Sequence, residues 1–172
     1  TTRSDPQRRR TVIDLIDGVR EYVYPVGRLD YDTEGLLLLT NDGDLAAKLT
    51  HPRHGIESTY QAHVAGIPDD DAVDRLRRGI PLDGRRTMPA EVVLLNRSGR
   101  EGVLLLTIRE GRNRQVRRMC EAIDHPVLKL VRVRIGDLEL ADLPVGKYRT
   151  LTGEDLRKLR QIPSRDPSRA KH

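Results

Sequence analysis

The stretch AEVVLLNRSGREGVLLLTIR, residues 90–109, decides the fold class of this chain. It consists of two apolar runs, 90–97 and 102–109, separated by the polar segment SGRE, which contains a glycine. Two such runs around a short turn are typical of a β-hairpin. We therefore expect two neighbouring antiparallel strands here, and a sheet in which hairpin strands outnumber βαβ units.

Outside this hairpin, alternation and short apolar runs predict further strands. Segment 58–66, STYQAHVAG, places Tyr60, Ala62 and Val64 on one face and polar side chains on the other, which is strand behaviour. The remaining expected strands are the end of YVYPVG (22–27), LLLLT (36–40), VLKLVRVRIG (127–136) and LEL (138–140).

Apolar spacing and end signals predict helices between these strands. In PDDDAVDRLRRGI, acids open the helix and arginines and a glycine close it. Thr152 followed by Asp155 resembles a capping box at the start of the last helix. The expected helices are 11–19, 44–50, 68–80, 111–123 and 154–162. Together with the strands they predict one α+β domain, followed by a disordered polar tail at 163–172.

The composition limits how the chain builds its core and where it works. Its 172 residues include no Phe, no Trp and five Tyr, so the core must consist of Leu, Val and Ile. The single cysteine, Cys120, falls on the apolar side of an expected helix, so we expect a buried thiol and neither a disulfide nor a zinc cluster. No apolar run approaches the ~18 residues of a membrane span, and the start carries no signal pattern, so we expect a soluble, cytoplasmic protein.

The positive charge is concentrated in one part of the chain. The net charge is +5, and residues 97–134 hold ten basic and four acidic side chains, a local net charge of +6. Such a surface suits a polyanion, because each neutralised phosphate releases counterions; from composition alone, a solvated charged face is an equally good interpretation. The lack of Phe and Trp argues against proteins that stack bases on aromatic platforms.

The segment GRLDYDTEG, residues 27–35, carries three carboxylates at alternate positions: Asp30, Asp32 and Glu34. Counted from Asp30, these and Gly35 match the opening of a calcium-binding EF-hand loop. The twelfth position of that loop should be a bidentate Glu, but it is Asn41. The residues after Gly35 form an expected buried strand instead of a helix, so we do not expect calcium here.

A pair of histidines in HPRH, His51 and His54, could also suggest a metal. Pro52 lies between them and disrupts a helix, and no third ligand stands nearby. The better interpretation is a pair of loop histidines, so the sequence predicts no metal site.

A single catalytic carboxylate is a further interpretation of GRLDYDTEG. Asp30 lies in a tight, glycine-bounded turn before a buried strand, where its side chain can be held rigidly. Such an aspartate can attack the anomeric carbon of a sugar, and a nearby cation would keep it ionised. The only dense supply of cations is the expected helix around 112–118. Tyr60 is a third element, and it can be either a core residue or an active-site ring.

A helical wheel of residues 112–118 selects one arginine. With Val116 facing the core and about 100° per residue, Arg114 and Arg118 point outward. Arg117 lies at the boundary between core and solvent, from which it can reach into a cleft. It can pair there with Asp30, although a plain structural salt bridge explains the same position.

Two long segments resemble a known family. They are YPVGRLDYDTEGLLLLTNDGDLAAKLTHPRHGIESTYQAHVAG (24–66) and REGRNRQVRRMCEAIDHPVLKLVRVRIG (109–136). Both are similar to the RNA pseudouridine synthases of the RsuA/RluB type, which modify uridines in ribosomal RNA. The resemblance extends from about Asp5 to Leu151 and rests on three separate motifs in the same order. It implies a mixed, largely antiparallel central sheet with flanking helices and a basic active-site cleft.

The resemblance also implies roles for single residues. The aspartate of GRLD, Asp30, is the catalytic one; Tyr60 lies against the target base, and Arg117 of QVR pairs with the aspartate. Asp32 and Glu34 match no catalytic position. The residues expected to hold RNA phosphates are Arg28, Arg112, Arg114 and Arg118.

The implied reaction converts uridine to pseudouridine without cofactor or metal. The base is extruded into the pocket, Asp30 attacks C1′ or abstracts a proton from the ribose, the N-glycosidic bond breaks, and C5 of the rotated uracil joins C1′. The motif is nearer to the large-subunit (23S) type than to the small-subunit (16S) type. A 16S enzyme and a non-catalytic RNA-binding or ribosome-assembly module remain the alternatives. We expect a monomer whose partner is ribosomal RNA.

The chain departs from the family pattern at its start. Members usually begin with a small S4-type RNA-binding domain and an NKP-x-G strand, and neither is found before or within TTRSDPQ. We therefore expect a catalytic domain over residues 1–162 that lacks the S4 domain and the first strand, and with them part of its grip on RNA.

Overall fold

The structure, a computed structural model, describes residues 22–51 and 56–160. The predicted helix at 11–19, the predicted tail at 163–172 and His54 lie outside the described residues. The described strands are β1 (Tyr24–Val26), β2 (Thr33–Gly35), β3 (Leu38–Thr40), β4 (Ser58–Ala65), β5 (Pro81–Leu82), β6 (Arg85–Arg86), β7 (Glu91–Leu94), β8 (Glu101–Ile108), β9 (Val127–Ile135) and β10 (Leu138–Glu139). The described helices are α1 (Gly43–Thr50), α2 (Asp70–Arg78), α3 (Gln115–Ala122) and α4 (Gly153–Arg160). None of these helices is long and apolar enough to cross a membrane.

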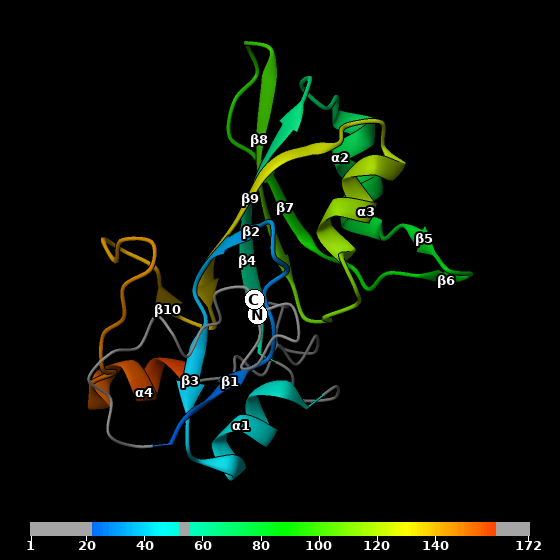
Figure 1. The fold of residues 1–172 in the computed structure, drawn as a ribbon. Helices are drawn as coiled ribbons and strands as arrows, with labels where there is room; N and C mark the ends of the chain where they lie inside the picture. Colours follow the sequence, from blue (N-terminus) through cyan, green and yellow to red (C-terminus); the bar gives the residue numbers. More distant parts are fainter. Residues whose placement is uncertain (1–21, 52–55, 161–172) are drawn as a thin grey trace, which may run out of the picture.

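A six-stranded sheet forms the centre of the molecule (Figure 1). Five of its strands follow in the order β10–β9–β4–β8–β7, and the sixth strand, β2, also pairs with β9. The pairs among these five strands are antiparallel, whereas β2 runs parallel to β9. The predicted hairpin is confirmed, because β7 pairs antiparallel with β8. The fold is therefore α+β with a mixed, largely antiparallel sheet and flanking helices, as the sequence predicts.

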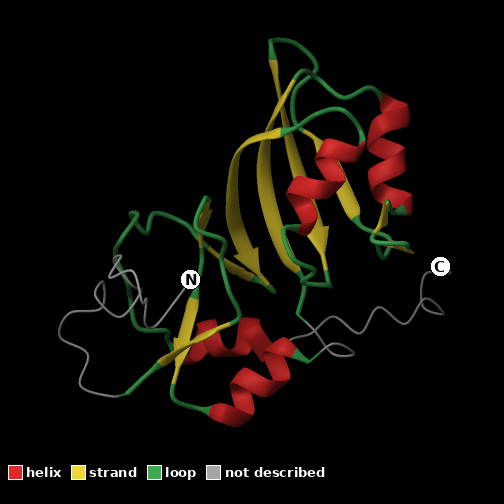
Figure 2. Ribbon diagram, turned by 45° about the vertical axis from the view of Figure 1, so that its right-hand side comes forward, coloured by secondary structure: helices red, strands yellow, loops and turns green. Residues whose placement is uncertain are grey.

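The larger hydrophobic cluster lies between this sheet and two helices. Alternate residues of β8, Leu104, Leu106 and Ile108, are buried, and α2 and α3 pack against the same cluster (Figure 2). Burial of one such aliphatic side chain stabilises the fold by about 1.5–3 kcal/mol. Cys120 is buried here, as predicted, and its burial raises the pKa of the thiol to about 12.

The predicted start and stop signals are confirmed at both ends of α2, and the predicted start signal is confirmed at α4. Asp69 caps α2 by accepting a hydrogen bond from the Ala72 N–H at 2.8 Å, and Gly79 closes the helix with a φ of +106°. At α4 the Asp155 N–H donates to Thr152 Oγ1 at 3.2 Å. The Thr152 N–H donates in return to Asp155 Oδ2 at 2.8 Å, which completes the predicted capping box.

A smaller hydrophobic cluster lies at the other end of the long strands. β1 pairs with β3, and α1, α4 and β10 surround this pair (Figure 1). The buried residues of this cluster are Leu36, Leu38, Leu49, Ile135, Leu138 and Leu159. Since Leu130 packs in the larger cluster and Ile135 in the smaller one, β9 contributes to both.

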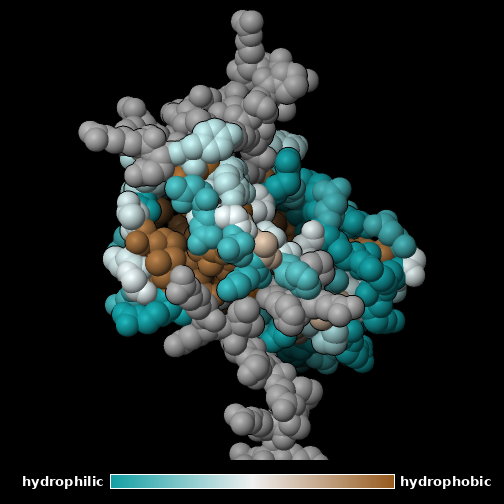
Figure 3. All heavy atoms as spheres, turned by 90° about the horizontal axis from the view of Figure 1, so that it is seen from below, coloured by the Kyte–Doolittle hydropathy of each residue, from teal (hydrophilic) through white to brown (hydrophobic). Residues whose placement is uncertain are grey.

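The smaller cluster is open on one side. Seen from below, hydrophobic side chains gather in a hollow of this part of the molecule (Figure 3). The groove has a volume of about 800 Å³ and is lined by β1, β3 and the segment 138–151. Beside it, Val145 is 83% exposed. Among the described residues, the smaller cluster is therefore less completely covered than the larger one.

The chain attaches β2 to the centre of the sheet through Gly35. A Cβ on Gly35 would lie 2.1 Å from the backbone oxygen of Arg132, and its φ of +112° is open mainly to glycine. The Leu36 N–H then donates to the Arg132 carbonyl at 2.9 Å. Nε and Nη2 of Arg132 donate back to the Leu36 carbonyl at 2.8 and 2.6 Å. This reciprocal clamp fixes the chain directly after the carboxylate-rich turn.

Some local predictions were wrong. The strand predicted at 36–40 covers only Leu38–Thr40, and the residues before it form the separate strand β2. The helix predicted at 111–123 begins only at Gln115, because Arg114 has a left-handed φ of +51°, which an α-helix excludes. The short hairpin of β5 and β6 was not predicted.

Candidate active site

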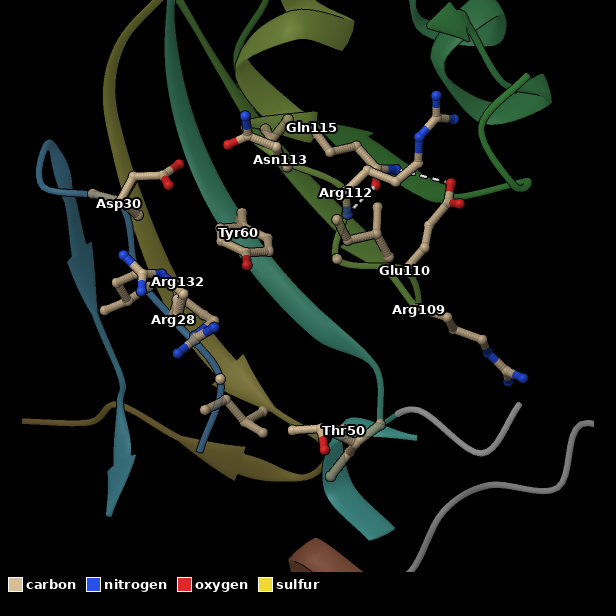
Figure 4. Close-up of a pocket in the computed structure, with 18 of the residues that line it drawn as sticks. Arg28, Asp30, Thr50, Tyr60, Arg109, Glu110, Arg112, Asn113, Gln115 and Arg132 are labelled. Atoms are coloured by element: carbon tan, nitrogen blue, oxygen red, sulfur yellow. Dashed lines mark hydrogen bonds between the residues drawn. The ribbon is translucent and has the colours of Figure 1, made fainter. Parts of the chain in front are cut away.

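A cleft between the two hydrophobic clusters collects most of the predicted site residues (Figure 4). Its volume is about 670 Å³. Residues 26–30 and 49–51 form one side, residues 108–117 form the other, and side chains of β4 and β9 lie between them. The predicted residues that line it are Arg28, Asp30, Tyr60, Arg112, Arg114 and Arg117, whereas Arg118 does not line it.

Asp30 is placed by a tight turn between β1 and β2. Its backbone carbonyl accepts a hydrogen bond from the Thr33 N–H at 3.0 Å, which closes the turn. The Asp30 side chain is 37% exposed and points into the cleft (Figure 4). Its Oδ2 lies 3.7 Å from Arg114 Nη1. Asp30 is thus accessible to a ligand and has one cation beside it.

Asp32, two residues further on, makes the stronger contacts. Arg114 Nη1 and Nη2 donate to its Oδ1 and Oδ2 at 3.0 and 2.9 Å, which is a bidentate pair. Arg117 Nη2 donates to the Asp32 backbone carbonyl at 2.6 Å, and Arg117 Nε lies 3.5 Å from Asp32 Oδ1. Asp32, which matches no catalytic position of the family, is therefore held by specific contacts with two arginines.

The expected pair of Asp30 and Arg117 is not formed among the described residues, where the carboxylate within 4 Å of Arg117 is that of Asp32. The start of α3 explains this difference. The helical wheel treated Arg114 as helical and outward-facing, but its left-handed backbone precedes the helix and turns the side chain toward the acidic turn. Arg117, from the first turn of α3, meets the backbone of Asp32.

Arg117 is more deeply placed than Arg28 and Arg114, and Arg132 in the same cleft is buried as well. The side chain of Arg117 is 11% exposed. Its buried Nε donates no hydrogen bond within the part of the chain that the structure describes. A buried donor without an acceptor is unfavourable by about 1–3 kcal/mol, and Asp32 Oδ1 lies 3.5 Å from this one.

The arginines fix the charge state of Asp32. The hydrogen bonds from Arg114 lower the pKa of the Asp32 carboxyl, and the charges of Arg117 and Arg114 add to this effect against the opposing effect of burial. The same hydrogen bonds, which Arg114 donates to Asp32, raise the pKa of Arg114. At neutral pH, Asp32 is therefore ionised and Arg114 is charged.

Tyr60 belongs to the core and to the cleft at once. The pairing of β4 with β9 shifts register between Thr59 and Tyr60, which places Tyr60 opposite Arg132. Such irregularities re-aim side chains at functional sites. Tyr60 is half-buried and packs against the larger cluster, and its ring borders the cleft (Figure 4). The two interpretations that the sequence left open are therefore compatible.

A buried glutamine holds the loop before α3. Gln115 is 4% exposed, and its Nε2 donates to Glu110 Oε1 at 3.0 Å. Its Oε1 accepts a hydrogen bond from the Arg112 N–H at 3.2 Å. The loop 109–114, which forms one side of the cleft, is thereby tied to the first turn of the helix.

The four predicted RNA-binding arginines differ in how available they are. Arg28 is exposed at the cleft, and Arg114 is engaged by the acidic turn. The guanidinium of Arg112 donates to the backbone carbonyls of Leu82 and Arg85 in the β5–β6 hairpin. Arg118 contacts Asp83 Oδ2 at 2.5 Å.

The carboxylates and histidines show no metal-binding arrangement where the structure describes them. Among the described residues, no three His, Cys, Asp or Glu side chains gather as metal ligands. The chain after Gly35 continues into β3 and not into a helix, so it does not follow the EF-hand pattern. His51 lines the cleft, but its predicted partner His54 lies outside the described residues.

Comparison with known proteins adds a second line of argument. The family model described as RNA pseudouridylate synthase matches residues 4–122, which is more than half of the chain. The chain belongs to the RNA pseudouridylate synthase family.

Relatives within this family cover most of the chain. It is 47% identical over 160 residues to ribosomal large subunit pseudouridine synthase B of Bacillus subtilis (strain 168), which covers 92% of this chain and 66% of the relative. It is 41% identical over 162 residues to ribosomal large subunit pseudouridine synthase E of Vibrio parahaemolyticus serotype O3:K6 (strain RIMD 2210633), covering 86% of this chain and 67% of that one. A crystal structure of a pseudouridylate synthase matches with a TM-score of 0.80 at 37% identity, covering 87% and 65%. The chain thus spans about two thirds of the length of these relatives.

Sequence reasoning missed three residues at this site: Asp32, which contacts Arg114 and Arg117 without lining the cleft, and Gln115 and Arg132, which do line it. Asp32 was set aside because it matches no catalytic position of the family. For Gln115 and Arg132, the sequence did contain a signal. Gln115 is a polar residue next to the apolar face of a helix, and Arg132 is a charged residue in the middle of an apolar strand; such residues are rarely buried without specific partners.

Proposed function

We propose that this chain carries the catalytic site of an enzyme that isomerises uridine in 23S ribosomal RNA to pseudouridine. The observation that carries the proposal is one accessible carboxylate, Asp30, in a cleft that also holds Tyr60, Arg114 and Arg117. Membership of the family supports the reaction class. The names of the two relatives, which are both large-subunit enzymes, support the substrate.

In this proposal Asp30 acts on the ribose of an extruded uridine. Ionised Asp30 either attacks C1′ or abstracts a proton to give a glycal, and in both routes the C1′–N1 bond breaks and its electrons leave with the uracil. The uracil turns, C5 forms a bond to C1′, and any bond or proton that Asp30 took is returned. N1 gains a proton and C5 loses one, so the reaction balances within the nucleotide and needs no cofactor.

Tyr60 and Arg117 assist this step. The ring of Tyr60 borders the cleft, so it stacks on the extruded base and can pass a proton. Arg117 keeps one buried N–H without an acceptor among the described residues. Because that donor is buried, it reaches an acceptor on the substrate or on Asp30 only after a movement of the turn.

Arg28 and Arg114 are the first candidates for RNA phosphates, because both line the cleft. For Arg112 and Arg118, a phosphate must replace the backbone carbonyls and the Asp83 carboxylate that they already contact. We therefore rank these two behind Arg28 and Arg114. The proposed setting is a monomer in the cytoplasm, with ribosomal RNA as its partner and no metal.

Replacement of the Asp30 carboxylate tests the proposal. The full-length protein and its Asp30→Asn variant are incubated with deproteinised 23S and 16S RNA from cells that lack the gene, and pseudouridines are mapped. We expect the wild type to modify 23S RNA and Asp30→Asn to lose roughly 10³-fold or more of the rate while it still binds RNA. Glu34→Gln is the matched control, because Glu34 lies in the same segment and its Oε2 is 3.9 Å from Lys129 Nζ, outside the cleft.

Each alternative predicts a different result. Product in 16S RNA alone overturns the large-subunit assignment. If the wild type binds both RNAs and forms no pseudouridine in either, the enzyme proposal fails and a non-catalytic RNA-binding module is favoured.

A further inference from the structure

One guanidinium is shared unequally by the two aspartates of the turn. Arg114 gives both of its hydrogen bonds, at 3.0 and 2.9 Å, to Asp32. Asp30 Oδ2 lies 3.7 Å from the same group, within reach of its charge but beyond a hydrogen bond. We propose that Asp32 is a positioning residue, which holds Arg114 beside Asp30 and prevents it from hydrogen-bonding to Asp30.

This division of contacts matters for the reaction, and the inference rests on the proposed function in this respect. Hydrogen bonds to a carboxylate stabilise its ionised form but also occupy the lone pairs that attack carbon or accept a proton. A cation at contact distance favours ionisation without occupying those lone pairs. Asp30 can thus be charged and reactive together, because Asp32 takes the hydrogen bonds.

The surrounding structure holds Asp32 in this role. Arg114 has a left-handed φ of +51°, which is unfavourable for a residue with a Cβ by about 1–2 kcal/mol and directs the side chain toward Asp32. Arg117 binds the Asp32 backbone carbonyl at 2.6 Å from the other side. The lowered pKa of Asp32 keeps its carboxylate charged.

Other charged or titratable side chains also face the cleft around Asp30. They are Arg28 from the same loop, His51 after α1, Tyr60 from β4, Arg109, Glu110 and Arg112 from the loop before α3, Arg117 from α3 and Arg132 from β9. Among the described residues, Arg114 is the cation within 4 Å of Asp30. If Asp32 loses its charge, Asp30 becomes the carboxylate nearest to Arg114.

The variant Asp32→Asn tests this arrangement. We expect Arg114 to turn to Asp30 and stabilise its ionised form. In an NMR titration with ¹³C-labelled aspartate carboxyl groups, the midpoint of Asp30 then moves to lower pH by roughly one unit or more. In the RNA assay, the plateau rate falls roughly ten- to a hundredfold, and the acidic limb of the pH–rate profile moves in the same direction.

Asp83→Asn is the matched control. Like Asp32→Asn, it removes one carboxylate charge and frees an arginine, here Arg118 of α3. Asp83, however, does not line the cleft. We expect neither the Asp30 midpoint nor the acidic limb to move in this variant. Circular dichroism establishes that both variants are folded.

The outcomes separate this inference from the proposed function. An unchanged Asp30 midpoint in folded Asp32→Asn overturns the inference, whatever the activity is. A lower rate with an unshifted acidic limb also overturns it, because that result indicates a structural role alone. If the wild type forms no pseudouridine, the proposed function fails, but the NMR titration still decides the role of Asp32.

Discussion

At Gly35 the chain passes so close to β9 that one added carbon atom has no room. The Cβ of an alanine would lie 2.1 Å from the Arg132 backbone oxygen and 2.6 Å from its nitrogen. Both contacts are with backbone, which cannot rotate away. We expect Gly35→Ala to lower the free energy of unfolding by about 2–4 kcal/mol, from overpacking and from the strain of a positive φ. Urea unfolding measures this loss.

Gly99 offers a control, because its φ is nearly the same as that of Gly35 and a Cβ added there has no close neighbour. Its φ is +110°, and a Cβ there meets nothing within 4 Å. Gly99→Ala should therefore lose only the part due to strain, about 1–2 kcal/mol. Equal losses in the two variants would show that the close approach of β2 to β9 adds nothing.

At the same scale, the sequence predicted which residues meet but not how they pair. Asp30, Tyr60 and Arg117 do line one cleft, since motif and helical face both pointed there. The pairing depends on the backbone of Arg114, whose positive φ no pattern of residue types announces. That one dihedral angle moves Arg114 from the solvent side to the acidic turn.

Among the elements, the start of α4 is stabilised by the carboxylate of Asp155. Asp155 accepts hydrogen bonds from Arg149 and from Thr152, and these lower its pKa, with the bond from Arg149 as the largest cause. Because the folded pKa is depressed, this contribution to stability is complete above the ordinary carboxyl pKa of about 3.9 and is lost as the pH falls below it. We expect Asp155→Asn to be less stable than the wild type at pH 7, and the difference to shrink below about pH 4.

Urea unfolding over a series of pH values measures that difference. Glu154→Gln, in the same first turn of α4, is the control, because Glu154 is exposed. A difference between wild type and Asp155→Asn that stays constant down to pH 2 would contradict the assigned cause.

With the exception of the β5–β6 hairpin, elements that rest on local signals were predicted, whereas a pairing that rests on a distant contact was not. The β7–β8 hairpin and both ends of α2 follow from turn and capping residues close in sequence. The parallel pairing of β2 with β9 joins Thr33 to Leu130, and no local period records such a contact. The β5–β6 hairpin did have a signal, because Asp83 and Gly84 with φ of +53° and +76° form the Asp-Gly turn that is typical of tight hairpins.

For the whole molecule, the proposed RNA contact gives a salt-dependent prediction. Arg28 is exposed at the cleft. If it neutralises one phosphate, Arg28→Gln should weaken RNA binding and reduce the slope of log K against log salt concentration by about 0.7–0.9. Filter binding or fluorescence anisotropy at several salt concentrations measures the slope.

Arg97 provides the comparison for this measurement. It is 75% exposed and lies 3.2 Å from Asp70, far from the residues that line the cleft. Arg97→Gln should leave the slope unchanged. The same reduction in both variants would indicate a diffuse field over the protein instead of a contact at the cleft.

The overall class was predictable because hairpin strands and capped helices add up to α+β. The division of the apolar residues into two clusters was not, since Leu130 and Ile135 lie five positions apart on one strand and still belong to different clusters. Their separation depends on how β9 spans the molecule. The expectation of one domain over residues 1–162 stays a prediction.

The position of the cleft between two clusters has a consequence for the lifetime of the protein. A ligand that touches both sides binds only when both clusters are folded, so by mass action it protects each of them from unfolding. Under the proposed function, bound RNA then lowers the fraction of molecules in which either cluster is unfolded, and with it the exposure of the chain to proteolysis.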